Sequence, residues 1–143
     1  MPLRSEATLE RFVRRGDGRL PGLVGFRLVA IEENRLAAEL DVRPDLLAPN
    51  GYLHAATVVA LADTACGYAC MAHLPAGAEN FTTIELKCNF LGTARDGTLE
   101  SVATPVHLGR TTQVWDAIVR AKETRRDIAV FRCTQLVIWP RSA

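Results

Sequence analysis

The sequence predicts an α+β fold in which an antiparallel sheet curls around one long central helix. Two observations lead to this prediction. The segment 55–74 is apolar on almost every side, and a helix of that kind must be covered on most sides. Most of the chain outside it alternates apolar and polar residues, as strands do, with turn signals between the runs. Because there is no repeat, linker or composition shift, we expect a single domain over residues 1–143.

Composition excludes several classes of protein. Of the 143 residues 48% are hydrophobic and 6% aromatic, which is too apolar for a disordered chain. The 17 basic and 16 acidic residues leave a net charge of +1, which argues against a nucleic-acid partner. The charged residues of segment 1–15 argue against a secretion signal. The four cysteines have no CxxC spacing, so we expect a reduced, cytoplasmic protein without a metal site.

The N-terminal half predicts a short helix and a hairpin. Leu9, Phe12 and Val13 have helical spacing within segment 5–15, and the glycines and proline of segment 16–22 should break that helix. Two extended runs follow, at 25–32 and 35–42, joined by a turn at 33–34. Segment 44–51 is predicted to be a loop.

The central helix and four further strands complete the prediction. Segment 55–74 is about 30 Å long as a helix, and Pro75 and Gly77 should end it. Strands are expected near 84–90, 98–108, 111–121 and 128–139, for a sheet of about five to six strands. Ile84, Leu86 and Phe90 alternate with polar residues, which is typical of a sheet with one covered face. A sheet this small cannot close around so long a helix, so pairing with a second copy is expected.

Asp63 is the one clearly charged residue within the apolar helix. Its presence also argues against a membrane-spanning role for the helix. An unpaired buried carboxylate is costly, so something must compensate it. Asp63 is either a structural acid bonded to a hydroxyl or an arginine, or a nucleophile or general base that faces a pocket.

The start of the same helix is a second candidate site. His54 stands just before it, and the first amides, those of Ala55 and Ala56, have no acceptor within the helix. Such a terminus stabilises a carbonyl oxygen that becomes an oxyanion. It lies roughly 13 Å from Asp63 along the helix, which is too far for both to act on one carbonyl. If both belong to one active site, they come from different subunits.

Segments 49–57 (PNGYLHAAT) and 61–65 (LADTA) resemble the hotdog-fold acyl-CoA thioesterases, most closely the branch of the phenylacetic-acid-degradation and 4-hydroxybenzoyl-CoA thioesterases. That branch has a turn, a His-Gly-Gly motif, and Leu-Ala-Asp or Leu-Ala-Glu with the acid nine residues after the histidine. The spacing from His54 to Asp63 is the same. Segments 81–91 and 108–111 also resemble the family's third strand and its glycine-basic-threonine turn, so the resemblance spans nearly the whole chain.

The resemblance implies a dimer of hotdogs, often paired into a tetramer, with active sites at the dimer interface. Asp63 would act as nucleophile or general base, and the amide of Ala55 would polarise the thioester carbonyl from the other subunit. The turn Gly109-Arg110-Thr111 would lie near the nucleotide end of coenzyme A, where arginine suits phosphate; otherwise Arg110 is a solvated turn charge. Thr82 and Tyr68 are further candidates for substrate binding. No cofactor is implied.

The motif departs from the family in four places. Alanines replace the two glycines after His54. Ala48 stands where some members carry an amide side chain, and Asn50 either substitutes for that amide or makes the turn. Gly67 stands where some members carry a hydroxyl one turn after the acid. Thr64 points to another side of the helix and does not replace that hydroxyl.

The leading prediction is an acyl-CoA thioesterase that hydrolyses a medium-chain or aromatic acyl-CoA to the free acid and coenzyme A. The alternative from another class is a non-catalytic acyl-CoA-binding hotdog protein, favoured by the alanines at 48, 55 and 56 and by Gly67. A hotdog hydratase fits less well, because those enzymes pair histidine and acid differently. The expected partners are the acyl-CoA substrate and further copies of the chain, with no nucleic acid and no membrane.

Overall fold

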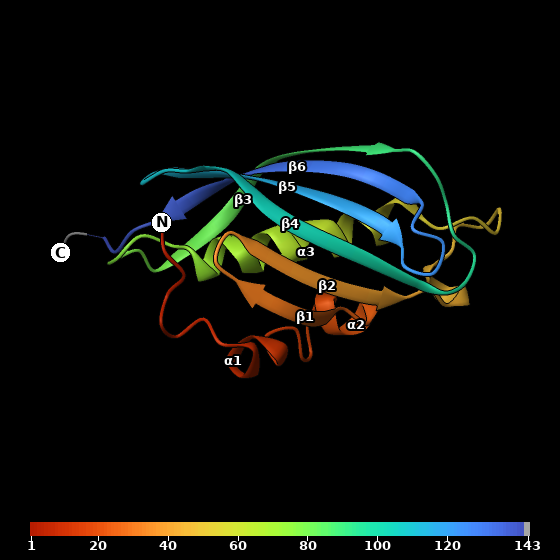
Figure 1. Cartoon of the computed structure of the whole chain (residues 1–143), viewed down its shortest axis with the longest axis horizontal. Coiled ribbons are helices and arrows are strands. Elements are labelled where there is room, and N and C mark those ends of the chain that lie inside the picture. The colour runs from red at the N-terminus through yellow and green to blue at the C-terminus, as the bar shows by residue number, and fades with distance from the viewer. Residues whose placement is uncertain (142–143) are drawn as a thin grey trace.

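A six-stranded, fully antiparallel sheet curls over one long helix (Figure 1), in a computed structural model that describes residues 1–141. The strand order is β1-β2-β4-β5-β6-β3, which leaves β1 and β3 as edges, so the sheet is not closed. The elements are α1 (Leu9–Val13), α2 (Leu20–Val24), β1 (Arg27–Glu32), β2 (Arg35–Asp41), the 3-10 turn η1 (Pro44–Leu46), α3 (Ala55–Ala72), β3 (Asn80–Phe90), β4 (Thr98–Leu108), β5 (Thr112–Ala121) and β6 (Asp127–Ile138). The predicted α+β architecture is confirmed.

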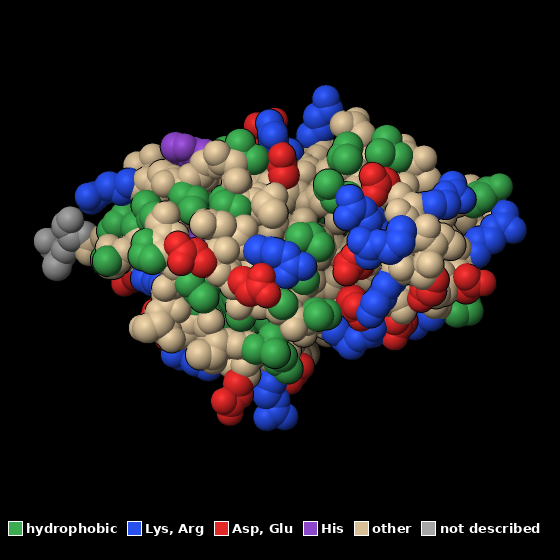
Figure 2. All heavy atoms as spheres, in the orientation of Figure 1, with side chains coloured by type: hydrophobic (Ala, Val, Ile, Leu, Met, Phe, Trp, Pro, Cys, Tyr) green, Lys and Arg blue, Asp and Glu red, His purple; other side chains and the backbone are tan. Residues whose placement is uncertain are grey.

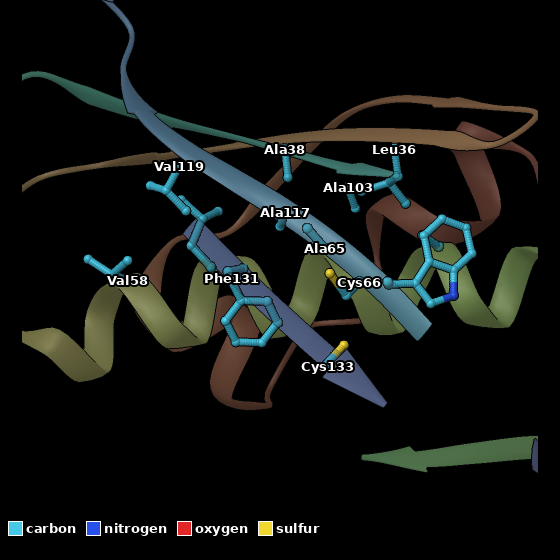
Figure 3. Packing of buried hydrophobic residues seen from close by; sticks show 14 of the residues in the cluster. Leu36, Ala38, Val58, Ala65, Cys66, Ala103, Ala117, Val119, Phe131 and Cys133 are labelled. Atoms are coloured by element: carbon cyan, nitrogen blue, oxygen red, sulfur yellow. The ribbon is translucent and has the colours of Figure 1, made fainter. Parts of the chain in front are cut away.

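The core lies between α3 and the concave face of the sheet. Ala62, Ala65 and Ala69 of α3 are fully buried, and their small side chains let the strands approach the helix closely. Figure 3 shows Cys66 of α3 and Cys133 of β6 among the core side chains. The helix has the length and mean hydropathy (1.4) of a membrane-crossing segment, but 56% of it is buried inside the protein. Burial under the sheet accounts for its apolar composition.

Buried polar groups fix the C-terminal end of α3. His73 caps the helix, and its Nδ1 lies 2.8 Å from the carbonyl oxygen of Ala69. Its Nε2 accepts the amide of Asn34, at 3.0 Å, from the β1–β2 turn, where Asn34 has a φ of 61°. Because Nε2 accepts a hydrogen, the ring is neutral and Nδ1 carries its proton. Gln113 of β5 donates to the His73 carbonyl at 2.9 Å, which ties the helix end to the sheet.

The N-terminal segment differs from the prediction in two ways. α1 is shorter than segment 5–15, because Thr8 caps the helix and accepts from the amide of Arg11. A second helix, α2, forms at Leu20–Val24, where segment 16–22 was predicted to contain only a break. Pro21 lies in its first turn, where proline is compatible with a helix. Gly25, with a φ of 83°, ends it.

The apolar face of β3 is less covered than its alternation predicts. A bulge between Thr83 and Glu85 displaces Ile84, which is 56% exposed. Leu86 and Phe90 lie on the inner face but are 42% and 48% exposed, because β3 is an edge strand and α3 covers it at Phe81 and Thr83 but not as far as Leu86 and Phe90. The outer face of the sheet carries scattered apolar side chains between charged ones, visible as the green spheres among blue and red in Figure 2.

The buried histidine predicts a pH-dependent stability. Burial lowers the pKa of His73, against the opposing hydrogen bond to Ala69. The unfolded chain, whose histidines titrate near the ordinary value of about 6.5, therefore binds a proton more readily than the folded chain. The contribution of His73 to stability is complete above about pH 6.5 and is lost as the pH falls below it. Urea unfolding between pH 8 and pH 5 should show this decline.

The test variant is His73→Gln, and the control is His107→Gln, because His107 is exposed and His73 is buried. We expect His73→Gln to cost about 1–3 kcal/mol at pH 8, because it disturbs buried hydrogen bonds, and to flatten the decline toward low pH. His107→Gln should keep the wild-type profile. A decline as steep in His73→Gln as in wild type would contradict this assignment.

Candidate active site

Asp63 lies in the middle of α3, half-buried, on the side of the helix that faces β3. The Thr83 hydroxyl of β3 donates to Asp63 Oδ1 at 3.2 Å. Burial raises the pKa of Asp63, and the hydrogen bond from Thr83 acts in the opposite direction. No lysine or arginine among residues 1–141 pairs with this carboxylate within 4.0 Å, although the ion pairs of the surface are numerous. A partly desolvated, unpaired carboxylate is a competent general base or nucleophile.

Thr83 is the site residue that the sequence analysis missed. The hydroxyl expected on α3, one turn after the acid, is absent because Gly67 stands there; a Cβ at Gly67 would come within 2.9 Å of the Phe81 ring. Phe81 and Thr83 both point to the inner face of β3, so the ring occupies that space and the hydroxyl arrives from the strand. Alternation along 80–90 does not identify Thr83: if Ile84, Leu86 and Phe90 form the covered face, Thr83 falls on the opposite face, and only the bulge between Thr83 and Glu85 brings Thr83 to the inner face together with Leu86.

The N-terminus of α3 presents one free amide. His54 is the N-cap, and its Nδ1 accepts from the amide of Ala56 at 2.9 Å. The amide of Ala55 is at the first helical position, has no acceptor within the helix, and has none elsewhere in residues 1–141. Both residues are exposed. The terminus can therefore polarise a carbonyl oxygen from outside the chain through Ala55, while His54 holds the first turn in place.

Asn50 makes the turn that precedes the helix. Its Oδ1 accepts from the amide of Tyr52 at 3.1 Å, and the amide of Gly51, whose φ is 81°, donates to the carbonyl of Ala48. This is the turn-forming alternative of the two that the sequence left open for Asn50. The side chain at this position is exposed, and its oxygen serves the loop.

The glycine-basic-threonine turn lies at the opposite end of α3 from His54. It joins β4 to β5, and the guanidinium of Arg110 stacks over the Trp139 ring, 4.5 Å from its centroid. The indole of Trp139 donates to the Arg110 carbonyl at 3.1 Å, and a Cβ at Gly109 would collide with His107. Arg110 and Thr111 are exposed. These contacts hold the turn against Trp139 and His107, and it presents a cation; the assignment of the turn to coenzyme A stays a prediction.

The other two candidates lie on different sides of the molecule. Thr82 is exposed on the outer face of β3, opposite Leu136, so it faces away from Asp63. Tyr68 packs edge-on against Phe12 and Phe26, with centroids 6.0 and 5.3 Å away, beside α1 and α2. Their role in substrate binding also stays a prediction.

The chain thus brings Asp63 and Thr83 together and keeps both apart from Ala55. The amide and the carboxylate lie on one straight helix, and their separation is set by its rise of about 1.5 Å per residue. The Ala55 amide of one chain therefore cannot reach a carbonyl that lies beside Asp63 of the same chain. In residues 1–141 no group of three or more His, Cys, Asp and Glu side chains could hold a metal ion.

Comparison with known proteins gives the chemistry that these groups serve. Residues 50–128 match the family model described as the Thioesterase superfamily. The chain is 36% identical over 123 residues to ComA2 of Bacillus subtilis, covering 80% of this chain and 90% of that protein. It is 32% identical over 111 residues to the 1,4-dihydroxy-2-naphthoyl-CoA hydrolase of Escherichia coli, covering 76% and 79%.

A solved structure agrees over almost the whole chain. A thioesterase from Haemophilus influenzae superposes with a TM-score of 0.89 at 30% identity, covering 96% of this chain and 95% of that one. Both the family match and these similarities include the segment that carries His54, Ala55 and Asp63. The chain therefore belongs to the thioesterase superfamily, and it is a hotdog-fold hydrolase of acyl-CoA thioesters.

Proposed function

We propose that the chain hydrolyses a medium-chain or aromatic acyl-CoA at a site shared by two copies, with Asp63 of one copy and Ala55 of the other acting on the same carbonyl. The observation that carries the proposal is the unpaired, half-buried carboxylate of Asp63 on the helix whose N-terminal amide is left free. The Escherichia coli relative is named for an aromatic acyl-CoA, which supports the aromatic arm of the proposal.

In this mechanism the thioester carbonyl oxygen accepts the amide of Ala55 from the second copy. Negative charge that develops on that oxygen is stabilised by the amide and by the helix terminus behind it. Asp63 either removes a proton from the attacking water or attacks the carbonyl carbon itself. When water is the nucleophile, the tetrahedral intermediate expels the thiolate of coenzyme A and leaves the free acid. When Asp63 is the nucleophile, the same expulsion leaves a mixed anhydride on Asp63, and a water then hydrolyses this anhydride to the free acid and the regenerated carboxylate.

The uncovered edge of the sheet supports a second copy at this place. β3 is an eleven-residue edge strand, and a long edge with exposed apolar side chains is normally paired or covered. Leu86 and Phe90 are exposed along it, and Leu91 is exposed directly after it. A second copy that covers this edge would bury these side chains and would reach Asp63.

A pocket beside the free amide supports an acyl group of moderate size. It has a volume of about 210 Å³ and lies between α2, η1 and the first turns of α3. Its lining is mostly apolar, with Asp45, His54 and Thr57 as its polar members; the apolar lining residues are Leu20, Val24, Leu46, Leu47, Ala56 and Ala60. This lining suits a ring or a chain of medium length, since apolar surface recognises apolar surface without fixing its shape.

The first prediction concerns the carboxylate. Asp63→Asn keeps the size of the side chain and removes its ability to accept a proton or attack, so turnover should fall at least about a hundredfold while the fold is retained. Release of free thiol from short, medium, long and aromatic acyl-CoAs measures this, with circular dichroism as the check on folding. Turnover at the wild-type level in Asp63→Asn would make Asp63 a structural acid.

The second prediction concerns pH. Asp63 must be ionised to act, and burial raises its pKa above the ordinary 3.8. Activity should therefore be lost as the pH falls through that raised value, at higher pH than an exposed aspartate would give. The acid limb of kcat/KM against pH reports it. A limb at or below 3.8 would show that desolvation does not govern this carboxylate.

The third prediction concerns the shared site. Ala55→Pro removes the free N–H at the first helical position, where proline is tolerated, so it should lower kcat by about 10²–10³-fold without unfolding α3. Ala55→Gly keeps the N–H and is the matched control. Loss of activity in Ala55→Gly equal to that in Ala55→Pro would assign the effect to the side chain instead.

Mixing the two defective variants tests whether the groups come from different copies. A heterodimer of Asp63→Asn with Ala55→Pro contains one site with both groups intact. Refolding an equal mixture should therefore recover about a quarter of wild-type activity if dimers pair at random. No recovery would place both groups of one site on the same chain.

A further inference from the structure

Two glutamine side chains are fully buried on the inner face of the sheet, side by side on β5 and β6. Both polar atoms of the Gln113 side chain have a partner, because its Nε2 donates to the carbonyl of His73 and its Oε1 accepts from the indole of Trp115, both at 2.9 Å. Gln135 has a different connection. Its Oε1 lies 2.9 Å from the Thr83 hydroxyl, and its Nε2 lies 3.2 Å from the sulfur of Cys133.

The Thr83 hydroxyl therefore has two acceptors and one hydrogen. Asp63 Oδ1 lies 3.2 Å from Thr83 Oγ1, and Gln135 Oε1 lies closer, at 2.9 Å. When Asp63 is ionised, both oxygens compete for that single hydrogen. When Asp63 is protonated, its own O–H donates to Thr83, Thr83 donates to Gln135, and Gln135 donates to Cys133. The hydrogen-bond chain is complete only in the second case.

We propose that Gln135 is a positioning residue, which competes for the hydrogen of Thr83 and so keeps Asp63 ready to take a proton from water. It acts through Thr83, and its side chain is fully buried. The complete series of hydrogen bonds from Asp63 to Cys133 stabilises the protonated form of Asp63, which exists after Asp63 has accepted a proton from water. This favours the general-base role over the nucleophilic one, because a nucleophilic carboxylate gains nothing from stabilisation of its protonated form. The inference rests on the proposed function.

The surroundings of Asp63 contain few other ionisable groups. In the core these are the thiols of Cys66 and Cys70 on α3, Cys133 on β6 and Cys88 on β3. Burial raises the pKa of Cys66 and of Cys88, so both stay neutral where Asp63 titrates. The residues of β2, β4 and β5 that are buried against α3 are uncharged, as are all residues of α2. The competition between Asp63 and Gln135 for the hydrogen of Thr83 is thus the polar influence on the ionisation of Asp63 that substitutions can change.

The test compares Gln135→Leu with Gln113→Leu, two removals of a buried amide from adjacent strands. In Gln135→Leu the hydrogen of Thr83 goes to Asp63 alone, so the acid limb of kcat/KM should move to lower pH by about one unit. The plateau of kcat should fall several-fold because the base is weaker, with KM within about twofold of wild type. Gln113→Leu should leave the acid limb unmoved, whatever it does to stability.

A double-mutant cycle tests whether Gln135 acts through Thr83. Thr83→Val removes the donor to Asp63, so the acid limb should move to higher pH, and Thr83→Ser should restore it. Gln135→Leu added to Thr83→Val should cause no further movement. Gln135→Met replaces Gln135→Leu if the branched side chain prevents folding. A limb that moves upward or stays in place in Gln135→Leu, or that moves again in the double variant, would overturn the proposal.

A direct titration separates this inference from the proposed function. The ¹³C carboxyl resonance of Asp63 reports its ionisation without any substrate, in wild type, Gln135→Leu and Gln113→Leu. A downward movement of the Asp63 midpoint in Gln135→Leu alone supports the competition, even if Asp63→Asn keeps turnover and the proposed mechanism fails. An unchanged midpoint overturns it, even if the thioesterase assay behaves as expected.

Discussion

The fold depends on the packing of the sheet against α3. This helix is apolar on nearly every side, and the six-stranded sheet that covers it is too small to enclose it. α3 contributes alanines and one glycine to its contact with the strands, so the backbones come close and the core needs few large side chains. The end of the helix is tied to the sheet by His73 and Gln113, whose buried hydrogen bonds are all made. Everything else in the fold is placed by how the six strands wrap this helix.

The same constraint explains why the site is incomplete in one chain. The sheet has two edges, and α3 cannot cover the inner face of β3 as far as Leu86 and Phe90. A straight helix also holds Asp63 and the amide of Ala55 apart, because its rise is fixed. The second copy proposed above would cover the exposed edge and would also bring an Ala55 amide to Asp63.

The carboxylate shows how one glycine redistributes a site. Gly67 has no side chain to offer Asp63, and Phe81 fills the space that it leaves. The hydroxyl comes instead from Thr83 on the neighbouring strand, which links Asp63 to Gln135 and so to the core. A helix hydroxyl would have served the acid alone. A strand hydroxyl connects the acid to a series of buried hydrogen bonds. The number of hydrogens available for these bonds depends on whether Asp63 is ionised or protonated.

The sequence by itself determined the α+β architecture, the central helix, the hairpin and the family, because hydrophobic period, turn residues and the His54 to Asp63 spacing are local signals. It missed α2, whose first turn tolerates the proline that was interpreted as a break. Only the tertiary structure decided that Thr83 meets Asp63 and that Gln135 meets Thr83, because Thr83 and Gln135 lie 20 and 72 residues from Asp63 along the chain. Their contact depends on the bulge after Thr83 and on the pairing of β3 with β6, which no local pattern specifies.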